Sequence, residues 1–174
     1  DHEGVGLAPR ALEVMLKAYA GPDSYLAALG RGPRPGEPRE AFLLRVLRLL
    51  ERVRVLAAHR RGRLGVAGLN AAIQSALAEA RDGCVQVGTR GTRWHGRPIL
   101  VTENNYDVDL RNGDVGMLVR EGGDDIAVFA GSAPGEIKER ALAQLPQHET
   151  VFAMTVHKSQ GSEFSHTVMV LPNE

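Results

Sequence analysis

A short turn near the end of the sequence concentrates side chains that can bind an anion. It lies within MTVHKSQGSEF, residues 154–164, between the apolar runs VFAMTV and TVMVL. His157 and Lys158 can both donate hydrogen bonds to an anionic group. The neighbouring hydroxyl and amide donors are Thr155, Ser159, Gln160 and Ser162. Because ligands of open α/β sheets bind at the carboxyl ends of strands, the turn is a candidate binding site.

The second half of this turn carries different chemistry. Gly161 permits close approach of backbone to a ligand, and Ser162 can cap a short helical turn with N–H groups open to an anion. Glu163 is an acceptor that suits ribose hydroxyls or an arginine. The turn can therefore bind phosphates on one side and a sugar on the other. The residue types alone equally allow an ordinary polar turn with a capped helix.

The composition excludes several classes of protein. The 174 residues are 43% hydrophobic and 24% charged, which is typical of a soluble globular protein. Net charge is zero, so nucleic-acid binding requires local placement of charge. The lone Cys84 indicates a reducing, cytoplasmic setting and a core position. Neither a metal motif nor a membrane span is predicted, and a start at Asp1 rather than Met suggests a piece of a longer protein.

The elements that position the turn follow from periodicity. Residues 8–52 are predicted to be helical, with amphipathic stripes in PRALEVMLKAYA and EAFLLRVLRLLERV separated by the loop GRGPRPGEPRE. Residues 53–59 then predict a buried strand, a basic loop follows, and VAGLNAAIQSALAEAR predicts a helix. Strand, loop and helix in this order indicate an open α/β sheet. This pattern returns at Val151, and residues 157–166 are too few for more than one helical turn between the last two strands.

The middle of the chain has a different pattern. Several short alternating segments between residues 90 and 147 predict a small β-barrel or sandwich inserted into the α/β region. Asn112-Gly113-Asp114 predicts a type I′ hairpin turn, and Gly122-Gly123 predicts a second turn.

The order of residues in AMTVHKSQGSEF closely resembles motif V of superfamily 1 DNA helicases in the form used by the RecD family, the exodeoxyribonuclease V alpha subunits. GVAGLNAAI resembles that family's strand-loop-helix segment, and GRPILVTENNYDVDLRNGDVGMLV resembles the start of its inserted SH3-like barrel. LPQHETVFAMTVHKSQGSEFSHTVMVLP resembles the return from the insert. Together these segments span Val53 to Pro172.

The resemblance implies an α/β, RecA-like (P-loop NTPase-type) second motor domain with an inserted SH3-like β-barrel. Residues 1–88 would form the first part of this domain, with a helical lead-in at 1–52. Residues 89–147 would form the barrel, and residues 148–174 would return to the motor domain with motif V.

The resemblance also implies roles for single residues. The residues expected to contact DNA are Thr155, His157, Lys158, Ser159, Arg60 and Asn70. Gly161 and Glu163 are expected to face the nucleotide. A solvated loop position is the alternative interpretation for Arg60.

The implied activity is that of an ATP-dependent DNA helicase subunit in recombination and double-strand-break repair. Single-stranded DNA and other subunits of a RecBCD-like complex are the implied partners. The sequence contains no G-x-x-x-x-G-K-[ST], so ATP and Mg²⁺ belong to the longer parent protein. We expect neither to be bound by these residues, and no hydrolysis by them alone. The alternative function is a protein-interaction module that docks partner subunits through the barrel.

A second basic stretch lies where the barrel begins. Its members are Arg90, Arg93, Trp94, His95 and Arg97. An aromatic side chain flanked by arginines can stack a base of single-stranded DNA. The favoured interpretation is instead that Trp94 covers the end of the barrel beside solvated charges. Asp107 and Asp109 are interpreted as loop polarity, and His148 and Glu149 as part of the hinge at the barrel exit.

Overall fold

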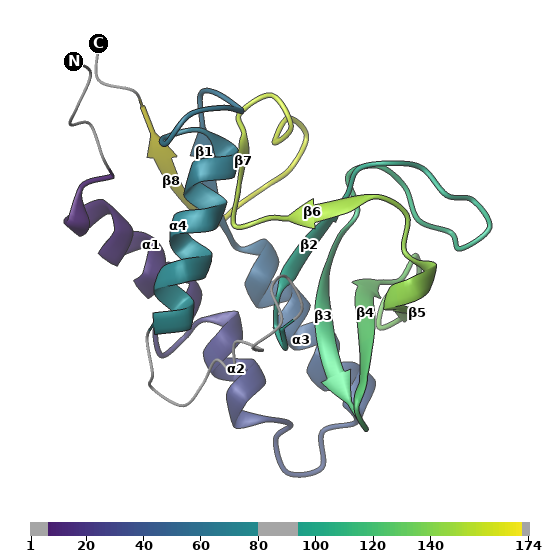
Figure 1. The fold of residues 1–174 in the computed structure, drawn as a ribbon. Coiled ribbons are helices and arrows are strands. Elements are labelled where there is room, and N and C mark those ends of the chain that lie inside the picture. The colour runs from purple at the N-terminus through teal and green to yellow at the C-terminus, as the bar shows by residue number, and fades with distance from the viewer. Residues whose placement is uncertain (1–6, 80–93, 172–174) are drawn as a thin grey trace.

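The part of the chain that the structure describes forms two β-sheets and four α-helices (Figure 1). The structure is a computed structural model that describes residues 7–79 and 94–171, so Cys84, Arg90 and Arg93 lie outside the described residues. One sheet is parallel and has three strands, and the other is antiparallel and has five. The expected mixture of α/β and all-β patterns is therefore present.

Helices dominate the first part of the chain, as predicted. They are α1 (Pro9–Ala20), α2 (Tyr25–Arg31), α3 (Arg39–Glu51) and α4 (Val66–Glu79). Proline occupies the first position of α1, where no backbone N–H is needed. The sequence pattern did not single out α2, which starts where Ser24 accepts a hydrogen bond from the Ala27 N–H at 3.2 Å.

The parallel sheet places the candidate turn. Its central strand β1 (Val53–Ala57) pairs with β7 (Ala153–Thr155) on one side and with β8 (His166–Val170) on the other. The link from β7 to β8 crosses β1 by turns and contains no helix, in agreement with its length. Because Ala57 lies beside Thr155, the loop after β1 and the turn after β7 leave the sheet together.

The antiparallel sheet has the strand order β5-β4-β3-β2-β6. Its strands are β2 (Pro98–Val101), β3 (Val115–Glu121), β4 (Asp124–Ala130), β5 (Ile137–Ala141) and β6 (His148–Thr150), and the 3₁₀ helix η1 (Leu142–Gln144) follows β5. Strands β5 and β6 are its edges and do not pair with each other, so the described strands form an open sheet rather than a closed barrel.

The second predicted turn is present and has type I′ geometry, which was predicted for the first turn instead. Gly122 and Gly123 have φ of 58° and 97° and join β3 to β4, as a type I′ turn requires. The turn at Asn112-Gly113 is not type I′, because only Gly113 has positive φ (105°). It closes the long connection 102–114 between β2 and β3, where no two-residue hairpin is needed.

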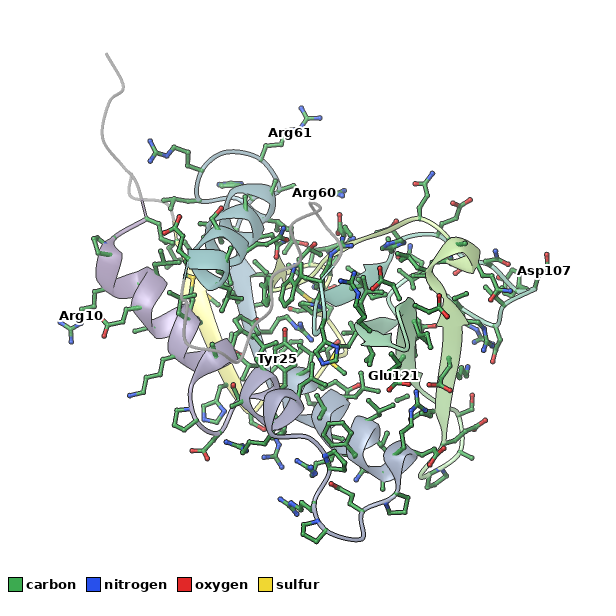
Figure 2. All side chains as sticks on the ribbon, turned by 60° about the horizontal axis from the view of Figure 1, so that its bottom comes forward. Arg10, Tyr25, Arg60, Arg61, Asp107 and Glu121 are labelled. Atoms are coloured by element: carbon green, nitrogen blue, oxygen red, sulfur yellow. The ribbon has the colours of Figure 1, made fainter. Side chains whose placement is uncertain are left out.

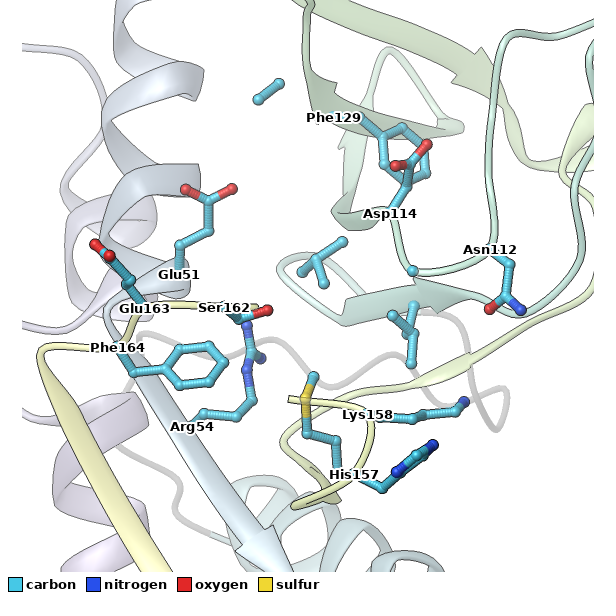
Figure 3. Close-up of a pocket in the computed structure, with 15 residues that line it drawn as sticks. Glu51, Arg54, Asn112, Asp114, Phe129, His157, Lys158, Ser162, Glu163 and Phe164 are labelled. Carbon is cyan, nitrogen blue, oxygen red and sulfur yellow. The ribbon is translucent and has the colours of Figure 1, made fainter. Parts of the chain in front are cut away.

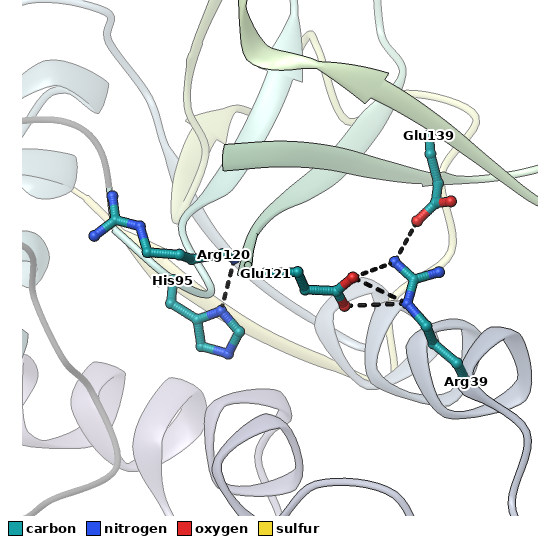
Figure 4. A network of polar contacts seen from close by, with 5 residues as sticks. All are labelled: Arg39, His95, Arg120, Glu121 and Glu139. Atoms are coloured by element: carbon teal, nitrogen blue, oxygen red, sulfur yellow. Dashed lines mark hydrogen bonds and ion pairs between the residues drawn. The ribbon is translucent and has the colours of Figure 1, made fainter. Parts of the chain in front are cut away.

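The apolar residues that the structure describes form three core clusters. The largest cluster joins residues of the helices, such as Leu47 and Ile73, to Met117 of β3 and Phe152 before β7. At the surface, the Arg39 guanidinium at the start of α3 binds the carboxylates of Glu121 and Glu139 (Figure 4). The network therefore ties α3 to two strands of the antiparallel sheet.

The neighbouring His95 in Figure 4 accepts a hydrogen bond at Nδ1 from the Arg120 backbone N–H, at 3.0 Å. Burial lowers the pKa of His95, which favours the neutral imidazole that this acceptor role needs. Within the described residues, no helix has both the length and the apolar character needed to cross a membrane.

Stability is expected to fall at alkaline pH because of Tyr19. Its hydroxyl donates to the Phe152 carbonyl, and burial raises its pKa from 10.0 to about 12. Between these values the unfolded chain has lost a proton that the folded chain retains, so unfolding becomes more favourable as pH rises. The loss should be about 2–3 kcal/mol by pH 12.

Urea denaturation from pH 9 to pH 12 measures this loss of stability. The Tyr19→Phe variant is the control, and its pH dependence should be smaller. Some dependence should remain, because burial also raises the pKa of Tyr25. Equal pH dependence in the two proteins would contradict the assignment to Tyr19.

Candidate nucleic-acid interface

The turn after β7 is built partly by its own polar side chains. The Thr155 Oγ1 accepts a hydrogen bond from the Lys158 backbone N–H at 3.2 Å, and the Ser159 hydroxyl donates to the Val156 carbonyl at 2.7 Å. Gly161 has a φ of 83°, which favours glycine. Ser162 was predicted to cap a helical turn, but Thr155 has the capping role because the hydrogen-bonded turns begin at Val156.

Three side chains hold the backbone that leads into this turn. The Asn70 Oδ1 of α4 accepts hydrogen bonds from the N–H groups of Phe152 and Ala153, at 2.8 and 2.9 Å. Its Nδ2 donates to the Ala153 carbonyl at 3.1 Å. Tyr19 donates to the Phe152 carbonyl, and Arg54 Nη1 donates to the Val151 carbonyl at 2.8 Å. The start of β7 is thereby fixed to α1, α4 and β1.

Four of the residues expected at DNA line one groove of about 570 Å³. They are Arg60 after β1, Asn70 on α4, and Thr155 and Lys158 at the turn after β7. We call this feature the Arg60 groove. Its full lining is Arg60, Arg61, Val66, Ala67, Asn70, Glu149, Thr150, Met154, Thr155 and Lys158. Figure 2 shows Arg60 and Arg61 on the loop that follows β1, with Arg61 pointing outward.

The remaining predicted residues lie elsewhere around the turn. His157 and Glu163 line a second hollow of about 630 Å³, the Glu163 cleft, which separates the turn from the antiparallel sheet (Figure 3). Lys158 borders both hollows. Ser159 and Gly161 line neither. The structure thus places His157 in the Glu163 cleft rather than in the Arg60 groove.

A buried arginine forms one wall of the Glu163 cleft. Arg54 is 1% exposed, its Nε has no hydrogen-bond partner among the described residues, and its guanidinium lies 5.4 Å from the centre of the Phe164 ring. Burial lowers the pKa of Arg54. Burial likewise raises the pKa of Glu51 in the same cleft, and the charge of Arg54 opposes that rise. The cleft therefore contains a partly unsatisfied cation beside carboxylate acceptors.

Sequence reasoning missed Arg54 and the structural role of Asn70. An arginine inside the otherwise apolar strand VRVLA was a signal for a buried polar group, since charged residues are rarely fully buried without a purpose. Nothing in the sequence pointed to the bond between Asn70 and β7. All three hydrogen bonds of the Asn70 amide are made with backbone groups, so Asn70 is a positioning residue for the turn.

Trp94 is part of the core. It is 1% exposed and stacks on Phe152, with ring centroids 6.0 Å apart and planes at 14°. It cannot also stack a nucleic-acid base, so the favoured interpretation of Trp94 as a covering residue holds. Arg97 is not solvated as predicted: it is 5% exposed, and its Nε donates to the Thr150 hydroxyl at 2.8 Å.

Asp107 and Asp109, in the connection between β2 and β3, are polar loop residues, as predicted. Asp109 pairs with Lys138 at 2.6 Å, which lowers the pKa of its carboxyl, and the Asp107 N–H is bound by the Asn105 side chain. Across the described residues, no group of three or more His, Cys, Asp or Glu side chains is arranged to hold a metal ion.

Comparison with known proteins identifies relatives through sequence. No family model matches. The chain is 43% identical to the RecBCD enzyme subunit RecD of Haemophilus influenzae over 70% of its length, and 39% identical to that of Mycolicibacterium smegmatis over 80%. It is 32% identical to the ATP-dependent RecD2 DNA helicase of Deinococcus radiodurans over 80%. These matches cover 17%, 23% and 19% of the relatives, so the chain spans about a fifth of their length.

Among solved structures, the Pif1 helicase from Bacteroides in complex with ADP-AlF3 and single-stranded DNA is similar over 97% of this chain and 44% of that one. The sequence identity is 11% and the TM-score is 0.46. Because this TM-score is below 0.5, the relationship rests on the sequence relatives.

Proposed function

This chain belongs to the RecD family, and from that premise we propose that it is a DNA-binding part of an ATP-dependent helicase motor. The observation that carries the proposal is the Arg60 groove. Residues from three separate segments meet there: Arg60, Asn70 and the pair Thr155 and Lys158. All four belong to the set that motif V and its neighbouring segment imply for DNA.

The groove suits the backbone of single-stranded DNA. Arg60, Arg61 and Lys158 supply positive charge, which binds phosphate irrespective of base sequence. The Thr155 hydroxyl adds a neutral donor. Contacts with phosphates do not depend on base sequence, so a motor can bind and release the strand at every position. With a net charge of zero over the chain, this local concentration of cations provides the attraction.

Gly161 and Glu163 are the proposed nucleotide-facing residues. The Glu163 carboxylate in its cleft can accept hydrogen bonds from ribose hydroxyls, and the positive charge of Arg54, which lines the same cleft, attracts an anionic group. The residues present therefore fit one wall of a nucleotide site. Hydrolysis of ATP in the longer protein would supply the free energy for movement, and Mg²⁺ would neutralise phosphate charge. Lys158 then connects the two hollows, because its side chain lines both of them, and His157 precedes it on the same turn.

The parallel sheet with α1 and α4 is proposed as part of a RecA-like second motor domain, formed by residues 1–88 and 148–174. Residues 89–147, which contain strands β2 to β5 of the antiparallel sheet, would be the inserted SH3-like module. Relatives named RecBCD enzyme subunit suggest a multi-subunit assembly for the longer protein. The similarity to helicases covers both parts, so a separate docking module is not favoured.

Fluorescence anisotropy of a labelled oligothymidylate across a salt series tests the proposal. Affinity should fall as salt rises, and Lys158→Ala should weaken binding and reduce the slope of log K against log salt by about 0.7. His157→Ala reports whether the Glu163 side of the turn also contacts the strand. Lys17→Ala is the control, because Lys17 is exposed on α1 and lines neither hollow. Binding that ignores both salt and Lys158→Ala would overturn the proposal.

A further inference from the structure

The Arg60 groove contains a carboxylate where a phosphate-binding surface should have none. Among the described residues that line it, Glu149 is the single acidic side chain. Glu149 belongs to β6, the edge strand through which the chain leaves the antiparallel sheet and returns to β7. Its Oε1 lies 3.2 Å from the Nζ of Lys158. The lysine expected to bind DNA is therefore already paired.

This ion pair contributes little to holding the fold together. The side chains of Lys158 and Glu149 are 31% and 41% exposed, and pairs with that exposure are worth little in water. Glu149 makes no other side-chain hydrogen bond among the described residues. Its carboxylate can thus leave Lys158 at low cost, provided that another anion takes its place.

We propose that Glu149 is a built-in competitor for the DNA phosphate at Lys158. This inference rests on the proposed function of the groove. In the DNA-free protein the Glu149 carboxylate is paired with the Lys158 ammonium group. A phosphate that enters the groove displaces this carboxylate. The exchange lowers the affinity for the DNA strand, which suits a surface that must release DNA repeatedly. Because Glu149 stands on β6, the exchange also changes a contact between the antiparallel sheet and the turn.

The isosteric change Glu149→Gln removes the competing charge and keeps the size of the side chain. Oligothymidylate affinity at low salt should rise by about fivefold, because the phosphate no longer has to replace a carboxylate that attracts the Lys158 ammonium from a few ångströms away in water. The gain should shrink as salt screens the exposed groove. Glu103→Gln is the matched control, since it makes the same charge change on an exposed residue outside the groove, and it should leave the affinity unchanged.

A double-mutant comparison tests whether Glu149 lowers DNA affinity through Lys158. In a Lys158→Ala background, Glu149→Gln should raise affinity by less than about twofold, because the residue that the two anions share is gone. Thermal unfolding of each variant checks that all are folded. A cooperative transition close to that of the unmodified chain is expected for Glu149→Gln.

Three outcomes would overturn the inference, and they differ in what else they overturn. If the unmodified chain binds DNA and Glu149→Gln binds no better, the competitor role fails while the proposed function stands. If the gain is as large without Lys158, the charge acts through general repulsion and the exchange at Lys158 is wrong. If no protein of the set binds at low salt, both the DNA groove and the role of Glu149 are wrong.

Discussion

Replacing Asn70 with Ala is expected to lower the free energy of unfolding by about 2–4 kcal/mol. The change deletes the acceptor of the Phe152 and Ala153 N–H groups, whose residues are 0% and 1% exposed. Buried donors left without a partner cost about 1–3 kcal/mol each. Chemical denaturation of the two proteins measures the difference.

Two further variants separate the anchoring role of Asn70 from a direct role at DNA. Asn70→Asp keeps an acceptor for both N–H groups and loses only the donor to the Ala153 carbonyl, so it should cost less stability than Asn70→Ala. Asn70→Asp also adds negative charge to the groove. Its loss of DNA-binding free energy should therefore exceed its loss in the free energy of unfolding. Gln74→Ala, one turn further along α4, removes only a 3.5 Å contact with Thr150 and is the control. Equal stability of Asn70→Ala and Gln74→Ala would contradict the anchoring role.

Replacing Trp94 with Ala is expected to cost about 3–5 kcal/mol, the range for removing a large aromatic side chain from a core. The indole is 1% exposed and packs on Phe152, whose backbone is held by Asn70 and Tyr19. The loss of Trp94 should therefore loosen the segment that enters the motif V turn. Denaturation followed by circular dichroism measures this effect, because the variant has no other tryptophan for fluorescence.

The exposed aromatic Tyr106 provides the comparison for Trp94. Its side chain is 76% exposed, so Tyr106→Ala should change stability by less than about 0.5 kcal/mol. In the unmodified chain, the sole tryptophan should emit at the short wavelengths of a buried indole, and oligothymidylate should not quench it. Strong quenching by DNA, together with a small cost of Trp94→Ala, would restore the base-stacking interpretation.

Local pattern in the sequence determined much of the fold. The stripe in PRALEVMLKAYA predicted α1 to its residue boundaries, and VAGLNAAIQSALAEAR predicted α4 from its first residue, with residues 80 and 81 of that prediction outside the described residues. The paired glycines at 122 and 123 predicted the β3–β4 turn. These features depend on side-chain period and on the φ that a residue tolerates, and both are properties of neighbouring residues. The spacing within the motif V turn likewise carried the resemblance to the RecD family.

Tertiary structure decided which polar groups remain available for a ligand. The sequence placed Asn70, Lys158 and Trp94 among candidates for DNA contact, but packing gives them different environments. Asn70 bonds to backbone 82 residues away, Lys158 pairs with Glu149, and Trp94 is enclosed beside Phe152. The type of a residue fixes what it can donate or accept. The partner that uses this capacity depends on contacts between distant segments, and only the folded chain brings those segments together.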